Sequence, residues 1–103
     1  MPKRREVRIL AKAKEDFTEI MDYISLDKPS AAHALADRIE SSINHLVENP
    51  QLGRLAREKN LAQLGYRYLI VGGYLIFYTY IEDEDIIIHR ILHSARDYGR
   101  ILG

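Results

Sequence analysis

The chain has 103 residues, no cysteine and a formal net charge of zero, with 15 Lys and Arg residues against 15 Asp and Glu residues. This length suits one small domain, and the absence of cysteine excludes a disulfide framework and a thiolate metal site. The net charge of zero argues against general polyanion binding. No apolar run approaches the roughly 20 residues that span a bilayer. We therefore expect one domain over residues 1–103 that is soluble, cytoplasmic and without a membrane partner.

The first elements expected along the chain are a short strand and a helix. Residues 5–11 alternate between two sides of an extended chain, which predicts the strand. From Ala13 the apolar residues take helical spacing; they are Ala13, Phe17, Ile20, Met21 and Ile24. No Ser, Thr, Asn or Asp precedes Ala13 to cap this helix, so no capping residue defines its start. Glu15 and Asp16 are acids suited to a first turn.

A second helix follows almost at once. Asp27–Ser30 breaks the first helix and starts another, because proline is tolerated in a first helical turn. The apolar stripe of the second helix is Ala31, Leu35, Ile39, Ile43, Leu46 and Val47, and Asn49-Pro50 ends it. We expect an antiparallel hairpin that packs on a sheet. Acids predominate over residues 15–49 and bases over residues 1–14, which predicts a basic edge beside an acidic helical layer.

The rest of the chain predicts a loop and then three antiparallel strands. Residues 50–65 read as a connection with room for one helical turn, and the tail from His93 is short and polar. Between Tyr66 and Leu92, β-branched and aromatic runs are separated by Gly72-Gly73, which suits a two-residue turn, and by the acidic turn Glu82–Asp85. The expected fold class is α+β: an N-terminal strand, a helical hairpin and a three-stranded meander forming one sheet.

These turns also predict which side chains share a face of the sheet. Pairing Val71 with Tyr74 places Arg67 opposite Tyr78, and pairing Glu82 with Asp85 places Tyr78 opposite His89. Both faces are largely apolar, so we expect both to be covered. We assign to the helices the face with Ile70, Leu75, Phe77, Ile81 and Ile88. The other face carries Arg67, Tyr74, Ile76, Tyr78, Tyr80 and His89.

The order of elements, together with five local phrases, resembles the RelE/ParE superfamily of toxins from bacterial type II toxin–antitoxin systems. The phrases are Val7–Ile9 leading into Ala13, Ile20–Ile24, Leu46–Pro50 followed by Gly53-Arg54, Tyr74–Tyr78 and Ile91–Tyr98. The likeness covers nearly the whole chain and is closer to the ParE branch, notably in His93–Asp97.

The resemblance implies a small toxin that is silenced by a cognate antitoxin wrapped over it. ParE-like members block DNA gyrase and are not known to be nucleases, whereas RelE-like members cut mRNA on the ribosome. Gyrase inhibition is the leading interpretation, and a binding module that has lost its toxicity is a third. The expected antitoxin contacts are Arg67, Tyr74, Ile76, Tyr78, Tyr80 and His89. Operator DNA would be contacted only indirectly, through the antitoxin.

The alternative function is that of a metal-independent mRNA endonuclease. RNA cleavage needs a base, an acid and cations around the phosphate, and the candidates are Arg67, His89, His93, Arg96 and Tyr98. RelE-like toxins place two basic side chains two residues apart on the first meander strand, where this chain has Arg67 and Leu69. They place an arginine early on the next strand, where this chain has Leu75. That loss of cations favours a non-catalytic protein, in which Arg67 and His89 pack or bind a partner.

No cofactor or metal is expected, since His33 and His45 lie away from the apolar stripe without ligand spacing. The strand tyrosines could stack on nucleobases, as in RNA-binding sheets. Tyrosines at alternating strand positions more commonly serve in packing or at a protein interface.

Overall fold

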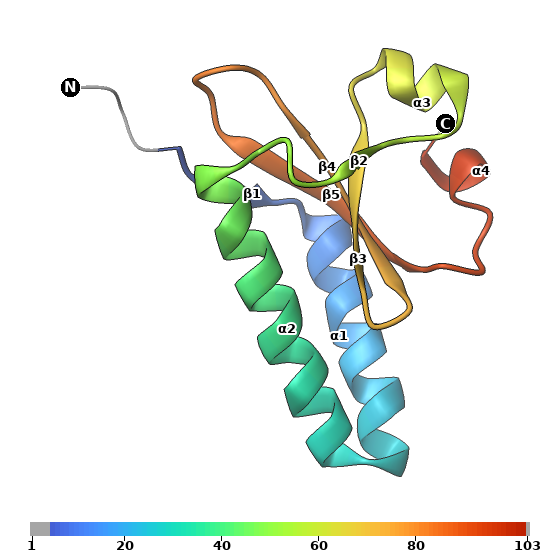
Figure 1. Ribbon diagram of the computed structural model, residues 1–103. Coiled ribbons are helices and arrows are strands. Elements are labelled where there is room, and N and C mark those ends of the chain that lie inside the picture. The colour runs from blue at the N-terminus through green and yellow to red at the C-terminus, as the bar shows by residue number, and fades with distance from the viewer. Residues whose placement is uncertain (1–4, 103) are drawn as a thin grey trace.

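One mixed sheet organises the molecule, and two long helices lie against one of its faces (Figure 1). The computed structural model describes residues 5–102. The elements are β1 (Val7–Ile9), α1 (Ala11–Asp27), α2 (Pro29–Glu48), β2 (Arg54–Leu55), α3 (Lys59–Gln63), β3 (Arg67–Val71), β4 (Tyr74–Tyr80), β5 (Ile86–His93) and α4 (Tyr98–Leu102). The strand order is β1-β5-β4-β3-β2, with β1 parallel to β5 and the other pairs antiparallel. The expected α+β class is confirmed.

The helical hairpin forms as expected, although α1 starts earlier than its apolar spacing suggests. Leu10 occupies the N-cap position without a side-chain hydrogen bond, so no capping residue marks the start. Because α1 begins at Ala11, Asp16 does not lie in the first turn, contrary to expectation. Pro29 begins α2, where its missing N–H would have no partner in the helix. Within residues 5–102 no helix is long and apolar enough to cross a membrane.

Two parts of the chain that read as irregular contain regular elements. The expected loop over residues 50–65 contains β2 and α3, and the tail beyond β5 ends in α4. All three are too short to produce a periodic pattern, because neither two nor five residues complete a repeat that can be distinguished from a loop. The diglycine turn is confirmed, with φ of 53° at Gly72 and 85° at Gly73, which glycine adopts without a Cβ penalty.

The pairing of β4 with β5 departs from the predicted register by one residue from Tyr78 to Tyr80. Tyr74 pairs with His93 and Phe77 with Arg90 as expected, but Tyr78 pairs with Ile88 rather than His89. A bulge between Phe77 and Tyr78 leaves His89 as the extra residue. The predicted pairing of Tyr78 with His89 is therefore wrong. The shift moves two isoleucines, Ile86 and Ile88, under the helices, where burial of apolar surface is favourable.

The helices cover the opposite face of the sheet from the one expected. The core under α1 and α2 contains Leu69, Val71, Ile76, Tyr78, Ile86, Ile88 and Ile91. Tyr68, Leu75, Phe77 and Leu92 form a second cluster on the other face, beneath α4. Ile70 and Ile81, expected in the core, are 56% and 66% exposed. After the bulge the helix-facing side is the more aliphatic of the two, and this decides which face the hairpin covers.

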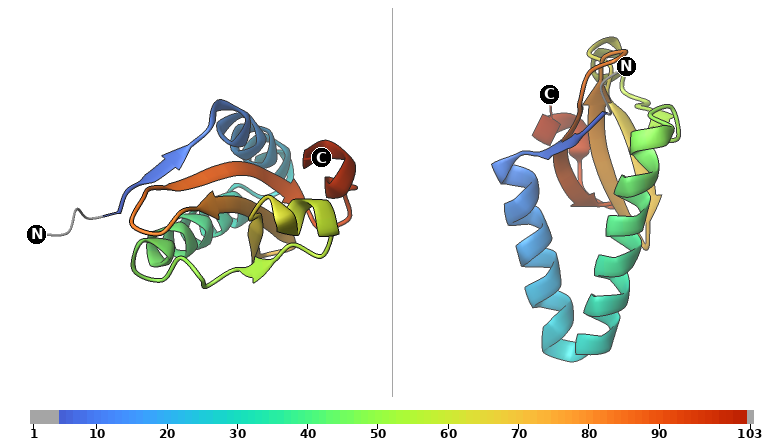
Figure 2. Two further views of the ribbon diagram at one scale, coloured as in Figure 1. Left: turned by 90° about the horizontal axis from the view of Figure 1, so that it is seen from above. Right: turned by 90° about the vertical axis from the view of Figure 1, so that its left-hand side faces the viewer.

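The two helices meet at their connection and diverge toward the sheet, as Figure 2 shows. α4 lies on the other side of the sheet from them. The sheet is thus covered fully on one side and partly on the other. Phe77 and Tyr78 point to opposite faces, each fully buried in a different cluster.

Candidate functional site: the helical groove and the open sheet face

A groove of about 420 Å³ opens where α1 and α2 diverge beside β1. Its lining residues are Val7, Ile9, Ala13, Lys14, Phe17, Thr18, Ala36, Ile39, Glu40, Ile43, Asn44 and Ile91. The buried members, such as Ile39 and Ile91, make an apolar floor, and the exposed members Lys14, Glu40 and Asn44 supply a polar rim. An apolar floor with a few polar groups around it is typical of a binding site.

The free edge of β1 continues this groove. β1 pairs only with β5, so within residues 5–102 its other edge carries no strand. Ile9 and Leu10 are 39% and 40% exposed there, and the exposed bases Arg8, Lys12 and Lys14 lie along the same segment. An unpaired edge offers backbone N–H and C=O groups to another chain. Edge and groove together fit an extended or helical segment with apolar and acidic side chains.

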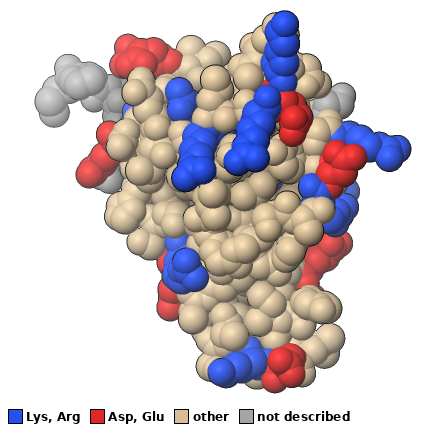
Figure 3. Space-filling view, turned by 45° about the vertical axis from the view of Figure 1, so that its right-hand side comes forward, with Lys and Arg blue, Asp and Glu red and all other residues tan. Residues whose placement is uncertain are grey.

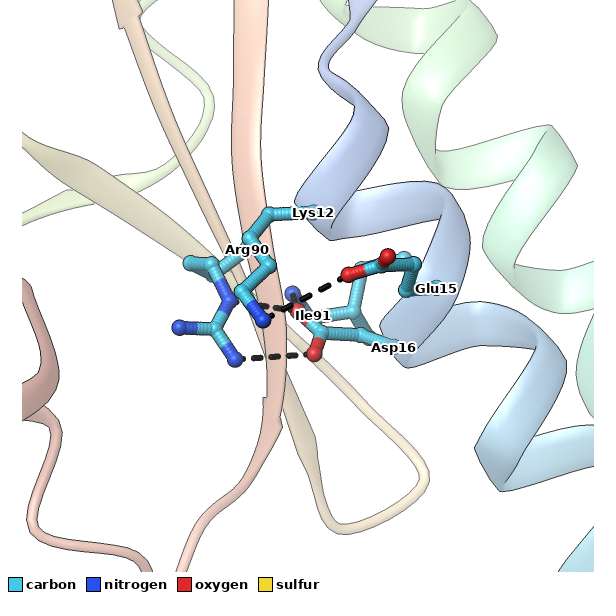
Figure 4. A network of polar contacts seen from close by, with 5 residues as sticks. All are labelled: Lys12, Glu15, Asp16, Arg90 and Ile91. Carbon is cyan, nitrogen blue, oxygen red and sulfur yellow. Dashed lines mark hydrogen bonds and ion pairs between the residues drawn. The ribbon is translucent and has the colours of Figure 1, made fainter.

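A bidentate ion pair fastens α1 to the edge of β5 (Figure 4). The Asp16 carboxylate accepts hydrogen bonds from Arg90 Nε at 2.7 Å, Arg90 Nη2 at 2.9 Å and the Ile91 N–H at 3.0 Å. β1 pairs with β5 only as far as Ile88, so Asp16 satisfies a backbone donor that has no strand partner. The Asp16 hydrogen bond also raises the pKa of Arg90. Because Ile91 lines the groove, this contact fixes the position of one groove wall.

Arg67 and Tyr78 belong to a structural network beneath the helices. The Tyr78 hydroxyl donates to the Pro50 carbonyl at 2.7 Å and accepts from the Gly53 N–H at 2.8 Å. Arg67 Nη1 donates to the Gly53 carbonyl at 2.9 Å. A Cβ on Gly53 would lie 2.6 Å from the Tyr78 ring, so only glycine fits without a shift. Burial raises the pKa of Tyr78. These contacts pin the loop between α2 and β2 to the sheet.

The expected antitoxin contacts do not form one outward surface. Ile76 and Tyr78 have no exposed surface and lie under the helices, so in this fold they cannot contact a partner. Tyr74 and Tyr80 are half-buried and pack against the same core. His89 lies on the other face of the sheet because of the bulge. The assignment of Ile76 and Tyr78 to an outward face is therefore wrong.

On the open face, His89 is held between two side chains. Its Nε2 lies 2.8 Å from Thr79 Oγ1, and its Nδ1 lies 3.5 Å from the Tyr66 hydroxyl. The Tyr66 and His89 rings meet edge to face with centroids 4.9 Å apart. Burial lowers the pKa of His89, so the imidazole is neutral at pH 7. Both ring nitrogens of His89 therefore lie within hydrogen-bond distance of hydroxyl groups of the protein itself.

The five candidate nuclease residues are not brought together. Arg67 lies on the helix side of the sheet and His89 on the open side. His93 is exposed, accepts the Ala95 N–H at Nδ1 and meets the Tyr74 ring edge-on. Arg96 is exposed, in the segment between β5 and α4. Within residues 5–102, no three His, Asp or Glu side chains could hold a metal ion together.

The fifth candidate, Tyr98, is a packing residue of α4. Its ring lies 5.0 Å from that of Phe77 on the open face. Burial, followed by the nearby Glu58 carboxylate, raises the pKa of Tyr98, which keeps its hydroxyl protonated at neutral pH. The space-filling view in Figure 3 shows Lys and Arg side chains spread among uncharged ones, with Asp and Glu close to several of them. On this face the mixture does not form a continuous basic track.

A helical hairpin on one face of a mixed sheet is a fold shared with solved structures of toxin–antitoxin systems. One similar structure is the chromosomal ParDE TA system from P. aeruginosa, with a TM-score of 0.69 and 22% identity over 87% of this chain and 96% of that chain. Another is the toxin–antitoxin complex RelBE2 from Mycobacterium tuberculosis, with a TM-score of 0.60 and 22% identity over 88% and 99% of the two chains. These likenesses establish the fold.

Sequence comparison gives the family. Residues 7–98 match the family described as the ParE toxin of the type II toxin–antitoxin system parDE. Toxin RelE2 of Caulobacter vibrioides is 39% identical over 85 residues, which cover 82% of this chain and 90% of that protein. The putative toxin Y4kP of Sinorhizobium fredii is 29% identical over 99 residues, covering 96% and 98%. The chain therefore belongs to the ParE toxin family and is the toxin of a type II toxin–antitoxin system, which confirms the superfamily expected from its phrases.

Sequence reasoning missed the residues that shape the groove. The sequence predicts Asp16 only as a first-turn acid and assigns no role to Arg90. One signal was present: Asp16 lies three residues after Ala13 and four before Ile20, and so on the apolar stripe of α1. An acid on a buried stripe requires a basic or backbone partner. The partner, however, lies 74 residues away, and its identity could not be predicted locally.

Proposed function

We propose that this toxin acts by binding DNA gyrase, without catalysing a reaction. The observation that carries the proposal is the separation of the nuclease candidates, because Arg67 and His89 occupy opposite faces of the sheet. A phosphate bound beside Arg67 would be out of reach of His89, and a phosphate beside His89 out of reach of Arg67. The cation and the base of a cleavage site would therefore not act on the same phosphate. The zero net charge also disfavours docking on ribosomal RNA.

A cognate antitoxin would silence the protein by occupying the groove between α1 and α2 and pairing with the free edge of β1. This proposal replaces the sheet-face contacts expected from the sequence. It is supported by the apolar floor, by exposed Ile9 and Leu10, and by the exposed bases of the same segment. Operator DNA would be reached only through the antitoxin.

The second candidate function is ribosome-dependent mRNA cleavage. It is favoured by the relative named Toxin RelE2 and by the exposed His93 and Arg96 near Tyr98 at one end of the open face. Purified protein added in parallel to a gyrase supercoiling reaction and to a translating ribosome extract separates the two. Inhibited supercoiling with intact message supports the first function, and codon-positioned cuts with normal supercoiling contradict it. Silence in both assays, with tight antitoxin binding, indicates a module without toxicity.

The antitoxin site is tested by co-expressing the toxin with its cognate antitoxin, which we expect the adjacent reading frame to encode. Ala36 lines the groove, whereas Ala34, on the same helix, is exposed and outside it. We expect Ala36→Phe to fill the groove and abolish co-purification, and Ala34→Phe to leave it unchanged. Co-purification of Ala36→Phe at the level of the wild type would place the antitoxin elsewhere.

A further inference from the structure

The far end of the helical hairpin projects beyond the sheet. Gly72, in the turn between β3 and β4, lies against Leu35 and Arg38 of α2. Residues of α2 before Leu35, and the end of α1 beside them, extend past this turn, as Figures 1 and 2 show. We call residues 19–33 the hairpin tip. Ile20, Met21 and Ile24 at its base still pack against the core, whereas the end of the hairpin lies beyond the sheet.

The tip exposes the two most exposed large apolar side chains among residues 5–102. Leu26 is 88% exposed and Tyr23 is 75% exposed. They lie three residues apart on α1 and so share one side of the helix. Ile20 and Ile24, on another side of α1, are half-buried and pack against the core. Tyr23 and Leu26 do not belong to either hydrophobic cluster of residues 5–102. Tyrosine is typical of an interface anchor, and the neighbouring leucine adds apolar surface beside it.

Acidic side chains border this apolar pair. Glu19, Asp22 and Asp27 are exposed at the tip, against Lys28 alone. No ion pair within residues 5–102 involves any of the three acids, whereas Glu15, closer to the sheet, pairs with Lys12 at 3.4 Å. An acidic border repels nucleic acid and anionic lipid. It complements a protein surface on which Lys and Arg surround an apolar pocket.

We propose that the hairpin tip is the surface with which the toxin engages its target, docking Tyr23 and Leu26 into an apolar pocket bordered by Lys and Arg. This inference rests on the proposed function. An enzyme that handles a DNA duplex carries such basic surfaces because it neutralises phosphates. The tip is distinct from the groove, whose lining residues reach only to Thr18 on α1 and begin at Ala36 on α2. Target binding and antitoxin binding therefore use different parts of one hairpin.

The test compares a tip variant with a matched control in the gyrase supercoiling and translation assays. The tip variant is Tyr23→Ser/Leu26→Ser, and the control is Leu64→Ser/Ile81→Ser, which removes two apolar side chains that are each 66% exposed at other places. We expect the tip variant to need at least about tenfold more protein for half-inhibition, because interface anchors contribute most of the binding energy. The control should match the wild type. Unchanged helicity and co-purification with the adjacent-frame protein show that the tip variant is folded.

A charge variant, Asp22→Lys/Asp27→Lys, should weaken inhibition in the same direction. Full inhibition by the Tyr23→Ser/Leu26→Ser protein would overturn the tip proposal while leaving the proposed function intact. If the wild-type protein inhibits translation but not supercoiling, and the tip variant does not inhibit translation, gyrase is overturned as the target and the tip is supported as the contact surface. A wild-type protein silent in both assays would overturn both proposals. If the wild-type protein dimerises and the tip variant is a monomer that still inhibits, the tip binds a second copy of this chain and the inference is overturned.

Discussion

Replacing Asp16 with alanine should destabilise the protein more than any change at an exposed ion pair. Asp16 is 8% exposed, and its carboxylate accepts two hydrogen bonds from Arg90 and one from the Ile91 N–H. Asp16→Ala leaves a mostly buried guanidinium and a backbone donor without partners. Removing one member of a buried pair costs about 3–5 kcal/mol. For a domain of this size, a loss of about 3 kcal/mol lowers Tm by roughly 12–24 °C.

Urea unfolding followed by circular dichroism measures this loss, with Lys12→Ala as the control. Lys12 pairs with Glu15 at 3.4 Å, but the two side chains are 67% and 62% exposed, so its loss should stay within about 1 kcal/mol. Asp16→Leu combined with Arg90→Met should recover only part of the stability, since replacing both members of a buried pair by apolar groups is often neutral but the Ile91 N–H stays without a partner. A loss below about 1 kcal/mol for Asp16→Ala would refute the argument that this contact fastens α1 to β5.

Three further predictions concern the sheet. Tyr78→Phe leaves the Gly53 N–H and the Pro50 carbonyl without their partner and should cost about 1–3 kcal/mol in urea unfolding, and no change would mean that water replaces the hydroxyl. Ile76→Asp should abolish folding, because Ile76 is fully buried, whereas Ile70→Asp at a 56% exposed position should leave the circular dichroism spectrum intact. In the folded protein the pKa of His89 lies below its ordinary value of 6.5, so the unfolded chain binds the proton more readily. The free energy of unfolding should therefore fall as the pH drops through about 6.5. His89→Gln should flatten that slope in urea titrations at different pH values. An unchanged slope in His89→Gln would assign the pH dependence to another group.

The groove and the tip divide one helical hairpin between two kinds of partner. The groove lies where α1 and α2 diverge beside the sheet, and its wall is held by the contact of Asp16 with β5. The tip lies at the opposite end, where the helices meet. An antitoxin confined to the groove and β1 would leave Tyr23 and Leu26 exposed, so its inhibitory effect would depend on how far it extends along the hairpin.

The sequence by itself determined the local features of this protein. Apolar spacing located both long helices and all three meander strands, Gly72-Gly73 located the first turn, and local phrases identified the superfamily. Each of these signals depends on neighbours within a few residues, and such patterns are readable without coordinates.

Only the tertiary structure decided which face of the sheet the helices cover. The bulge at His89 shifts the pairing of Ile86, Ile87 and Ile88 by one residue, and its gain comes from burying Ile86 and Ile88 under a hairpin far away in sequence. Asp16 and Arg90 likewise acquire their roles from a contact across 74 residues. The candidate site depends on these long-range contacts, and for that reason the face assigned to Ile76 and Tyr78 from periodicity alone was the wrong one.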